Sequence, residues 1–226
     1  MLRAVKNDIP LDMLSSSAVS KFTSPIVKKQ GAYLPHWQAS DACYFVTFRL
    51  AGSVPSHIKR DIQESRREIL TNVNREKRGL RPDELDILEE LHFQELDAAH
   101  LNQGNRFLKD DRIAKIVAEA LGHFDGIRYE LLAWAIMSNH VHIVFRILKN
   151  VEISHILHSW KSYTAKAANK ILKRTGAFWH SESYDHLIRN QEDLERCIQY
   201  TWQNPEKAGL KKQQWRWEAD SKIVQN

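Results

Sequence analysis

The chain has 226 residues, of which 42% are hydrophobic and 27% charged, and it carries a net charge of +5 with a pI near 9.1. This composition is typical of a globular protein and excludes a disordered chain, a collagenous repeat and a coiled-coil rod. No apolar run is long enough to cross a membrane, and residues 1–14 contain charged side chains but no apolar stretch typical of a signal peptide. We therefore expect a soluble, cytoplasmic protein.

The charge is distributed unevenly along the chain. Residues 56–100 carry 8 basic and 11 acidic side chains (−3), whereas residues 146–226 carry 14 and 9 (+5). A polyanionic partner is therefore expected to bind the C-terminal third. The two cysteines, Cys43 and Cys197, match no zinc or redox spacing and are expected to be buried thiols.

The first hundred residues contain one predicted strand and two predicted helices. Residues 1–38 lack a steady hydrophobic period and contain three prolines and a serine run, which indicates an N-terminal arm. Residues 43–50 are rich in β-branched and aromatic side chains and favour a strand. Helical patterns over 57–70 and 82–101 predict a helical hairpin, inserted at about 54–105, that caps the core.

The rest of the chain alternates between helical and strand patterns. We predict helices at 110–123, 153–175 and 192–204, strands at 129–137 and 140–148, and a possible strand at 186–189. Without the insertion, this order matches an α+β, ferredoxin-like βαββαβ antiparallel sheet with helices on one face. We assign residues 39–210 to this domain and residues 211–226 to a C-terminal tail.

Two histidines in the strand predicted at 140–148 form the sharpest local motif. Side chains two residues apart on a strand share a face, so His140 and His142 project together. Two neighbouring imidazoles form half of a divalent-metal site. The alternative is a pair of structural histidines that are hydrogen-bonded at the sheet surface.

A second pair of functional residues lies in the last predicted helix. Tyr200 and Asn204 are four residues apart and therefore share one helix face. The phenol is a potential nucleophile and the amide oxygen a potential metal ligand, with Gln203 as a competing amide ligand. The alternative is a packed tyrosine and a helix-ending asparagine, and Tyr163 and Tyr184 are rival nucleophiles.

Basic side chains in the C-terminal third are candidates for binding a polyanion. Lys161, Lys166 and Arg189 carry charges that can neutralise phosphates. For any one of them, the alternative is a solvated position on a basic surface.

Taken together, these motifs resemble a known family. Residues 134–142 (WAIMSNHVH) are similar to the HUH motif, histidine-hydrophobic-histidine, of the IS200-like single-tyrosine transposases. Residues 184–189 (YDHLIR), Tyr200 and residues 204–210 (NPEKAGL) resemble the C-terminal signature of the REP-associated tyrosine transposases. The resemblance spans roughly residues 34–210, and several ordered motifs are more specific than the two histidines alone.

The resemblance implies a metal-dependent HUH endonuclease and strand transferase that acts on single-stranded DNA beside hairpins, in DNA transposition and recombination. His140, His142 and Asn204 would bind Mg²⁺ or Mn²⁺. Tyr200 would attack the scissile phosphate and form a 5′-phosphotyrosine intermediate. The protein would be a monomer or a homodimer. The alternatives are a catalytically idle protein that binds DNA hairpins, and a phosphodiesterase that uses water in place of Tyr200.

Overall fold

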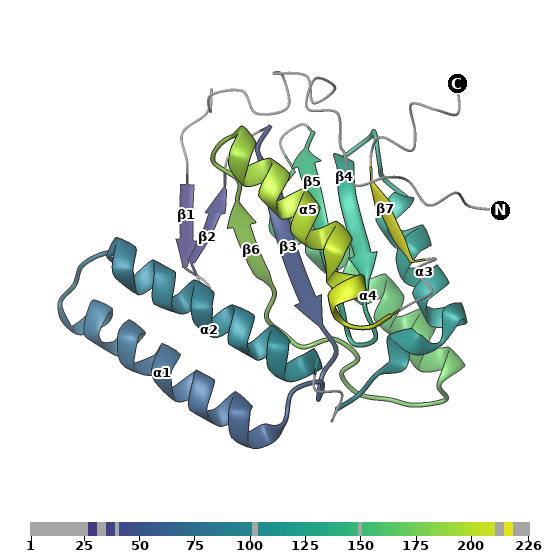
Figure 1. Ribbon diagram of the computed structural model, residues 1–226, viewed down its shortest axis with the longest axis horizontal. Helices are drawn as coiled ribbons and strands as arrows, with labels where there is room; N and C mark the ends of the chain where they lie inside the picture. The colour runs from purple at the N-terminus through teal and green to yellow at the C-terminus, as the bar shows by residue number, and fades with distance from the viewer. Residues whose placement is uncertain are drawn as a thin grey trace.

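A five-stranded antiparallel sheet with strand order β6-β3-β5-β4-β7 forms the centre of the molecule (Figure 1). The computed structural model describes residues 27–30, 35–38, 41–100, 104–148, 151–210 and 215–218. The sheet strands are β3 (Cys43–Arg49), β4 (Tyr129–Ile136), β5 (His140–Ile147), β6 (Tyr184–Leu187) and β7 (Arg216–Glu218). The helices are α1 (Ser56–Arg75), α2 (Pro82–His100), the 3-10 helix η2 (Phe107–Lys109), α3 (Asp111–Gly122), α4 (Ile153–Ile171) and α5 (Gln191–Lys207).

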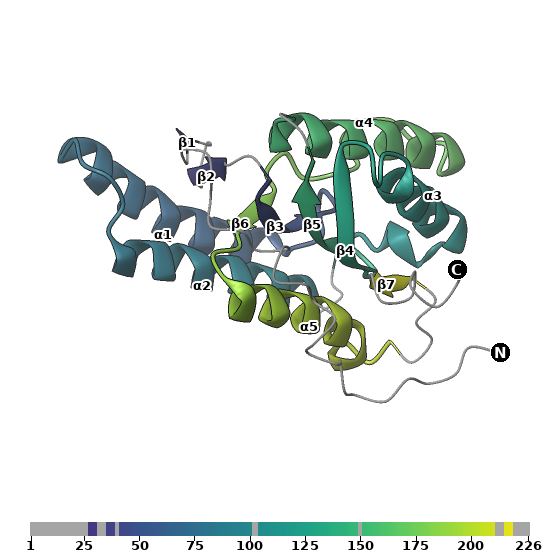
Figure 2. The ribbon, with the colours of Figure 1, turned by 90° about the horizontal axis from the view of Figure 1, so that it is seen from above.

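The connectivity confirms the predicted ferredoxin-like fold. The chain runs β3-α3-β4-β5-α4-β6, and the helical hairpin α1–α2 is inserted between β3 and α3. Helices α3 and α4 cover one face of the sheet, as predicted for the helices of the βαββαβ unit, while α5 and the α1–α2 hairpin lie on the other face (Figure 2). The histidine pair and Tyr200 lie on this second face.

Strand β3 is buried between these two layers. Its alternate side chains Tyr44, Val46 and Phe48 belong to the core shared with α3 and α4. Cys43 and Phe45 point the opposite way, into the core shared with α5, because successive strand side chains alternate between faces. Every residue of β3 is therefore buried.

Several element boundaries differ from the predictions. Helix α5 was predicted to end at Asn204, but it continues through Pro205 to Lys207. Pro205 lies in the last turn, so the helix loses few internal hydrogen bonds, and the Ala208 and Leu210 N–H groups still donate to the carbonyls of Asn204 and Pro205. Strand β6 begins at Tyr184, because this residue pairs with Thr47 of β3.

Three further differences concern the peripheral elements. Helix α1 extends beyond its predicted end to Arg75, and α4 ends at Ile171, before its predicted end. Inside the segment predicted as an arm, β1 (Val27–Gln30) and β2 (Pro35–Gln38) form a separate antiparallel hairpin. The cysteines agree with the prediction, since both are buried and neither forms a disulfide. Among the described residues, no helix combines the length and apolar character that a membrane crossing requires.

Candidate functional site

The two histidines of β5 converge on a single point. His140 and His142 have no exposed surface, and their Nε2 atoms lie 3.0 Å apart. The other ring nitrogens have separate partners: His140 Nδ1 lies 2.8 Å from Asn139 Oδ1, and His142 Nδ1 lies 2.9 Å from Thr47 Oγ1. Each imidazole is therefore held in place from the side opposite its partner.

This geometry fits a divalent cation. Neighbouring ligands of an octahedral ion at about 2.1 Å from the metal are separated by about 3.0 Å. When Asn139 Oδ1 accepts from His140 Nδ1–H, the Nε2 lone pair of His140 faces the shared point, and Thr47 Oγ1 can accept from His142 in the same way. The same separation also permits an Nε2–H···Nε2 hydrogen bond. The pair therefore fits both predictions, a metal-binding pair and a pair of structural histidines.

Tyr200 of α5 lies beside this pair. Its ring centroid is 5.4 Å from that of His142 and 5.7 Å from those of Phe45 and Phe93. The Lys207 ammonium lies 5.8 Å from the centre of the same ring. Helix α5 thus brings the predicted nucleophile to the predicted metal ligands, although Tyr200 and His142 are 58 positions apart in the sequence.

The other predicted residues on and near α5 differ in their burial. Asn204 is buried on the inward face of α5, whereas Gln203 is partly exposed, which favours Asn204 as the residue that faces the sheet. The rival Tyr163 is 60% exposed on α4, across the sheet from α5. The second rival, Tyr184, is buried beside Phe45, with the ring centroids 6.2 Å apart.

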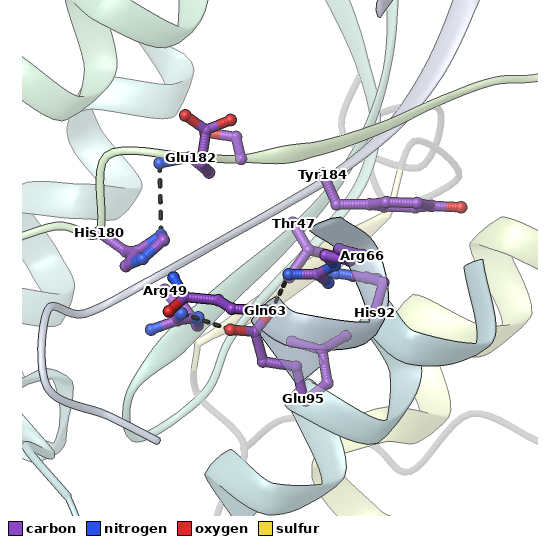
Figure 3. A pocket seen from close by; sticks show the side chains of 11 residues that line it. Thr47, Arg49, Gln63, Arg66, His92, Glu95, His180, Glu182 and Tyr184 are labelled. Atoms are coloured by element: carbon purple, nitrogen blue, oxygen red, sulfur yellow. Dashed lines mark hydrogen bonds and ion pairs between the residues drawn. The ribbon is translucent and has the colours of Figure 1, made fainter. Parts of the chain in front are cut away.

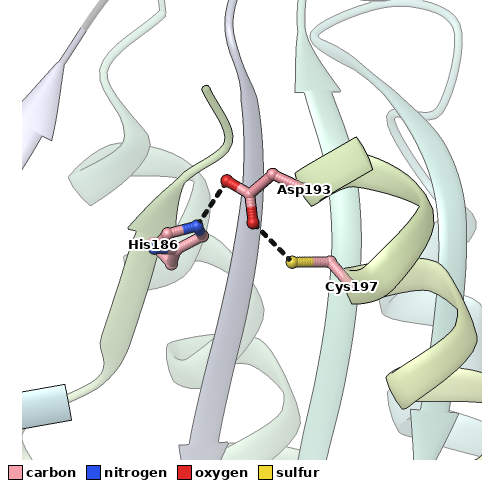
Figure 4. Close-up of side chains that lie close together, drawn as sticks. All are labelled: His186, Asp193 and Cys197. Carbon is pink, nitrogen blue, oxygen red and sulfur yellow. Dashed lines mark hydrogen bonds and ion pairs between the residues drawn. The ribbon is translucent and has the colours of Figure 1, made fainter. Parts of the chain in front are cut away.

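The start of α5 is fixed to β6 by Asp193 (Figure 4). Its carboxylate accepts hydrogen bonds from His186 Nε2 (2.8 Å), the Arg189 N–H (3.1 Å) and Arg196 Nη2 (2.7 Å). Burial acts to raise the pKa of Asp193, but these hydrogen bonds outweigh it and hold the pKa well below its usual range. The Cys197 thiol lies 3.9 Å from the same carboxylate, so His186, Asp193 and Cys197 form a second cluster with ligand atoms close enough to hold a metal. Both Asp193 carboxylate oxygens already accept hydrogen bonds. These bonds explain why the three side chains lie close together, and they give the cluster a structural role in holding α5.

The inserted hairpin forms one wall of a pocket that borders the site at Thr47 (Figure 3). Glu95 of α2 accepts from Arg49 Nη2 of β3 at 2.5 Å and from Arg66 Nη1 of α1 at 3.0 Å, and all three side chains are buried. Although burial opposes ionisation, the two arginines lower the pKa of Glu95. His92 of α2 stacks on Tyr184, with ring centroids 3.9 Å apart, and burial lowers its pKa.

Sequence reasoning missed this wall. The hairpin was predicted to cap the core, whereas it also places Arg66, His92 and Glu95 near the histidine pair. Period-two alternation in β3 does put Thr47 and Arg49 on the same face as His142 and His140, their cross-strand neighbours. The docking position of an inserted hairpin has no comparable local signal.

Two of the three predicted DNA-binding residues lie on α4, and the third lies between β6 and α5. Lys161 Nζ donates to Ser181 O (2.8 Å) and Ser183 Oγ (3.1 Å), and burial lowers its pKa to about 8. Lys166 is exposed on α4, and Arg189 is exposed between β6 and α5. Lys161 and Lys166 therefore share the helix that lies across the sheet from α5.

Comparison with known proteins addresses the family. Residues 105–204, a little under half of the chain, match the family model described as "Transposase IS200 like". The predicted resemblance to IS200-like transposases is confirmed. The IS200-like segment contains the histidine pair and Tyr200 and ends at Asn204, whereas helices α1 and α2 lie outside it.

Two solved structures are similar to this chain. One is a REP-associated tyrosine transposase bound to a REP hairpin, at 14% identity over 81% of this chain and 75% of that chain, with a TM-score of 0.47. The other is a candidate transposase from Deinococcus radiodurans r1, at 13% identity over 79% of this chain and 97% of that chain, with a TM-score of 0.37. No curated protein matches the chain.

Proposed function

We propose that this transposase-family protein is a metal-dependent endonuclease and strand transferase that cuts single-stranded DNA beside hairpins. The observation that carries the proposal is the convergence of the His140 and His142 Nε2 atoms, 3.0 Å apart, next to the ring of Tyr200. A metal-ligand pair beside a phenol is the minimum equipment for phosphoryl transfer to tyrosine.

His140, His142 and Asn204 would hold Mg²⁺ or Mn²⁺, and Thr47 and Asn139 would orient the two imidazoles. A bound divalent ion supplies Lewis-acid stabilisation of the charge that develops on the scissile phosphate. Asn204 is the preferred third ligand because it is buried, whereas Gln203 is partly exposed.

Tyr200 would carry out the covalent step. Its phenolic oxygen bonds to phosphorus as it loses its proton, the bond from phosphorus to the 3′ oxygen breaks, and that oxygen takes up a proton. The products are a 5′-phosphotyrosine and a free 3′-hydroxyl. The phosphodiester energy is retained, so attack by another 3′-hydroxyl rejoins strands without ATP.

The proposed partner is single-stranded DNA with hairpins, and Lys161, Lys166 and Arg189 would contact its phosphates. The proposed assembly is a monomer or a homodimer, and the proposed boundaries are an arm at 1–38, the transposase-like domain at 39–210 and a tail at 211–226. The second candidate function is a catalytically idle protein that binds DNA hairpins. The complete burial of both histidines favours this candidate, since DNA must reach them for catalysis.

The test uses labelled single-stranded hairpin oligonucleotides from the DNA that flanks the gene, with Mn²⁺ and a denaturing protein gel. The label should travel with the wild-type protein and with Tyr184→Phe and Tyr163→Phe, but not with Tyr200→Phe. Cleavage without bound label would instead identify water as the nucleophile. Binding without cleavage or adduct on every flanking hairpin would support the idle binding protein.

A further inference from the structure

A small pocket lined mostly by polar and charged residues lies between β3, the inserted hairpin and the loop before β6 (Figure 3). Its charged lining residues are Arg49, Arg66, Glu95 and Glu182. Thr47 belongs both to this lining and to the site, since its hydroxyl contacts His142 Nδ1. The pocket therefore shares a wall with the proposed metal site.

Arg66, which lines this pocket, has an unused hydrogen-bonding edge. Its Nη1 donates to Glu95, but its Nε and Nη2 atoms are buried and have no partner. These two atoms share one edge of the guanidinium and form the fork that binds phosphate or carboxylate in a bidentate manner. Buried donors without partners are costly, so this edge is suited to an oxyanion ligand.

A second buried group in the pocket also lacks a partner. His92 is 6% exposed and its ring is held by stacking on Tyr184, yet its Nε2 atom has no hydrogen bond. His180, also in the lining, accepts the Glu182 N–H with Nδ1, which leaves its Nε2 as the donor in the neutral ring. Two independent side chains, Arg66 and His92, thus have unmet hydrogen-bonding capacity at the same place.

The charge and size of the pocket fit part of a phosphate group. Both Glu95 oxygens are used by Arg49 and Arg66, so Glu95 neutralises only one of these two arginines. The Glu182 carboxylate balances the second arginine, so the excess positive charge at this pocket comes from the Lys161 ammonium beside the same loop. The cavity measures about 30 Å³, which is room for about two water-sized atoms, such as two oxygens of one phosphate.

We propose that the Nε/Nη2 edge of Arg66, together with His92, binds a non-scissile phosphate of the DNA strand that is cut at the histidine pair. The inserted hairpin would then position the substrate as well as cover the sheet. This inference rests on the proposed function, because it names a second contact to the same strand.

The test replaces single phosphates of the hairpin oligonucleotide by neutral methylphosphonates, one linkage at a time, and measures the rate of adduct formation. In the wild type, one linkage near the cut should slow the reaction by about 10-fold to 100-fold, the value of a hydrogen bond to a charged group. Arg66→Met should react slowly with the all-phosphate strand. A methylphosphonate at that one linkage should slow it no further, whereas methylphosphonates at other linkages should act as in the wild type. Arg66→Lys, which keeps the charge without the fork, should restore part of the rate.

The matched control is Arg67→Met, because Arg67 is the exposed neighbour of Arg66 on α1. It should keep the linkage profile of the wild type. If Arg66→Met does not fold, His92→Phe replaces it, since phenylalanine keeps the stacking on Tyr184 but has no ring nitrogen. If the methylphosphonate substitutions had the same effects on the wild type and on the folded pocket variant, the proposal would be overturned. The pocket would then be a site for water only.

A second measurement separates this proposal from the proposed function. Inorganic phosphate at constant ionic strength should raise the Tm of the wild type more than that of Arg66→Met or His92→Phe, because a ligand of the folded state stabilises it. This shift is expected even if no covalent adduct forms, in which case only the proposed function fails. If inorganic phosphate raised the Tm but no methylphosphonate changed the rate through Arg66, the pocket would bind phosphate from a source other than the DNA strand. The absence of both effects would reject the site.

Discussion

At the scale of single residues, the Nδ1 partners of the two histidines determine how the imidazoles face the proposed metal. Thr47 is the more informative partner, because its hydroxyl reaches across from β3 to His142 Nδ1 at 2.9 Å. Thr47→Val removes this contact and leaves the ring free to turn. We expect Mn²⁺ affinity to fall by about 10-fold to 100-fold, which metal titration followed by electron paramagnetic resonance measures.

Thr164→Val is the matched control for this prediction. Thr164 is also buried and hydrogen-bonded, but it lies on α4, across the sheet from α5. Its loss should lower stability without changing Mn²⁺ affinity. If Thr47→Val bound Mn²⁺ as tightly as the wild type, orientation of His142 by Thr47 would be disproved.

At the scale of elements, α5 depends on Asp193 for its attachment to β6. The pKa of Asp193 in the folded protein lies below its value of about 3.9 in an unfolded chain. Its ionised form therefore stabilises the fold above that unfolded value, and this contribution is lost as the pH falls through the folded pKa. We expect the difference in unfolding free energy between the wild type and Asp193→Asn to shrink progressively from about pH 5 downwards.

Urea denaturation at a series of pH values tests this expectation. Asp86→Asn serves as the control, because Asp86 is exposed on α2. Its difference from the wild type should stay small throughout. A constant gap between the wild type and Asp193→Asn from pH 6 to pH 3 would show that the ionised carboxylate does not stabilise α5.

The inserted hairpin depends in a similar way on Glu95. Glu95→Gln leaves Arg49 and Arg66 buried without their shared counter-charge, and breaking a buried ion pair typically costs about 3–5 kcal/mol. We expect a loss of this order in the unfolding free energy, or local opening of the hairpin seen as faster amide hydrogen exchange in α2. Glu90→Gln, at an exposed position of α2, should change neither measurement. A Glu95→Gln protein with the stability and exchange of the wild type would show that the triad does not hold the hairpin.

At the scale of the whole molecule, the core was predictable because its signals are local. Strand patterns in β3, β4 and β5 and helical spacing in α3 and α4 account for five of the six elements of the βαββαβ unit. Period-two alternation placed His140 and His142 together, and helical spacing placed Asn204 one turn from Tyr200. The pocket was not predictable, since Arg66 and His92 reach it only through the tertiary docking of an inserted hairpin.

The distribution of charge over the whole molecule leads to the last prediction. Neutralisation of phosphates releases counterions, so DNA affinity should fall as salt is raised from about 50 to 200 mM. Lys166→Gln should reduce the slope of log affinity against log salt by about 1, because one phosphate contact is lost. Fluorescence anisotropy with a single-stranded hairpin oligonucleotide measures this slope.

Lys115→Gln is the matched control for the salt dependence of Lys166→Gln. Lys115 is also exposed, but it lies on α3 with its Nζ 3.8 Å from Glu119, outside the basic C-terminal third. Its loss should leave the salt slope unchanged. Lys166 lies on α4, across the sheet from Tyr200, so a reduced slope for Lys166→Gln alone would mean that the DNA extends around the molecule. An unchanged slope for both variants would instead confine the DNA to the face that carries α5 and the inserted hairpin.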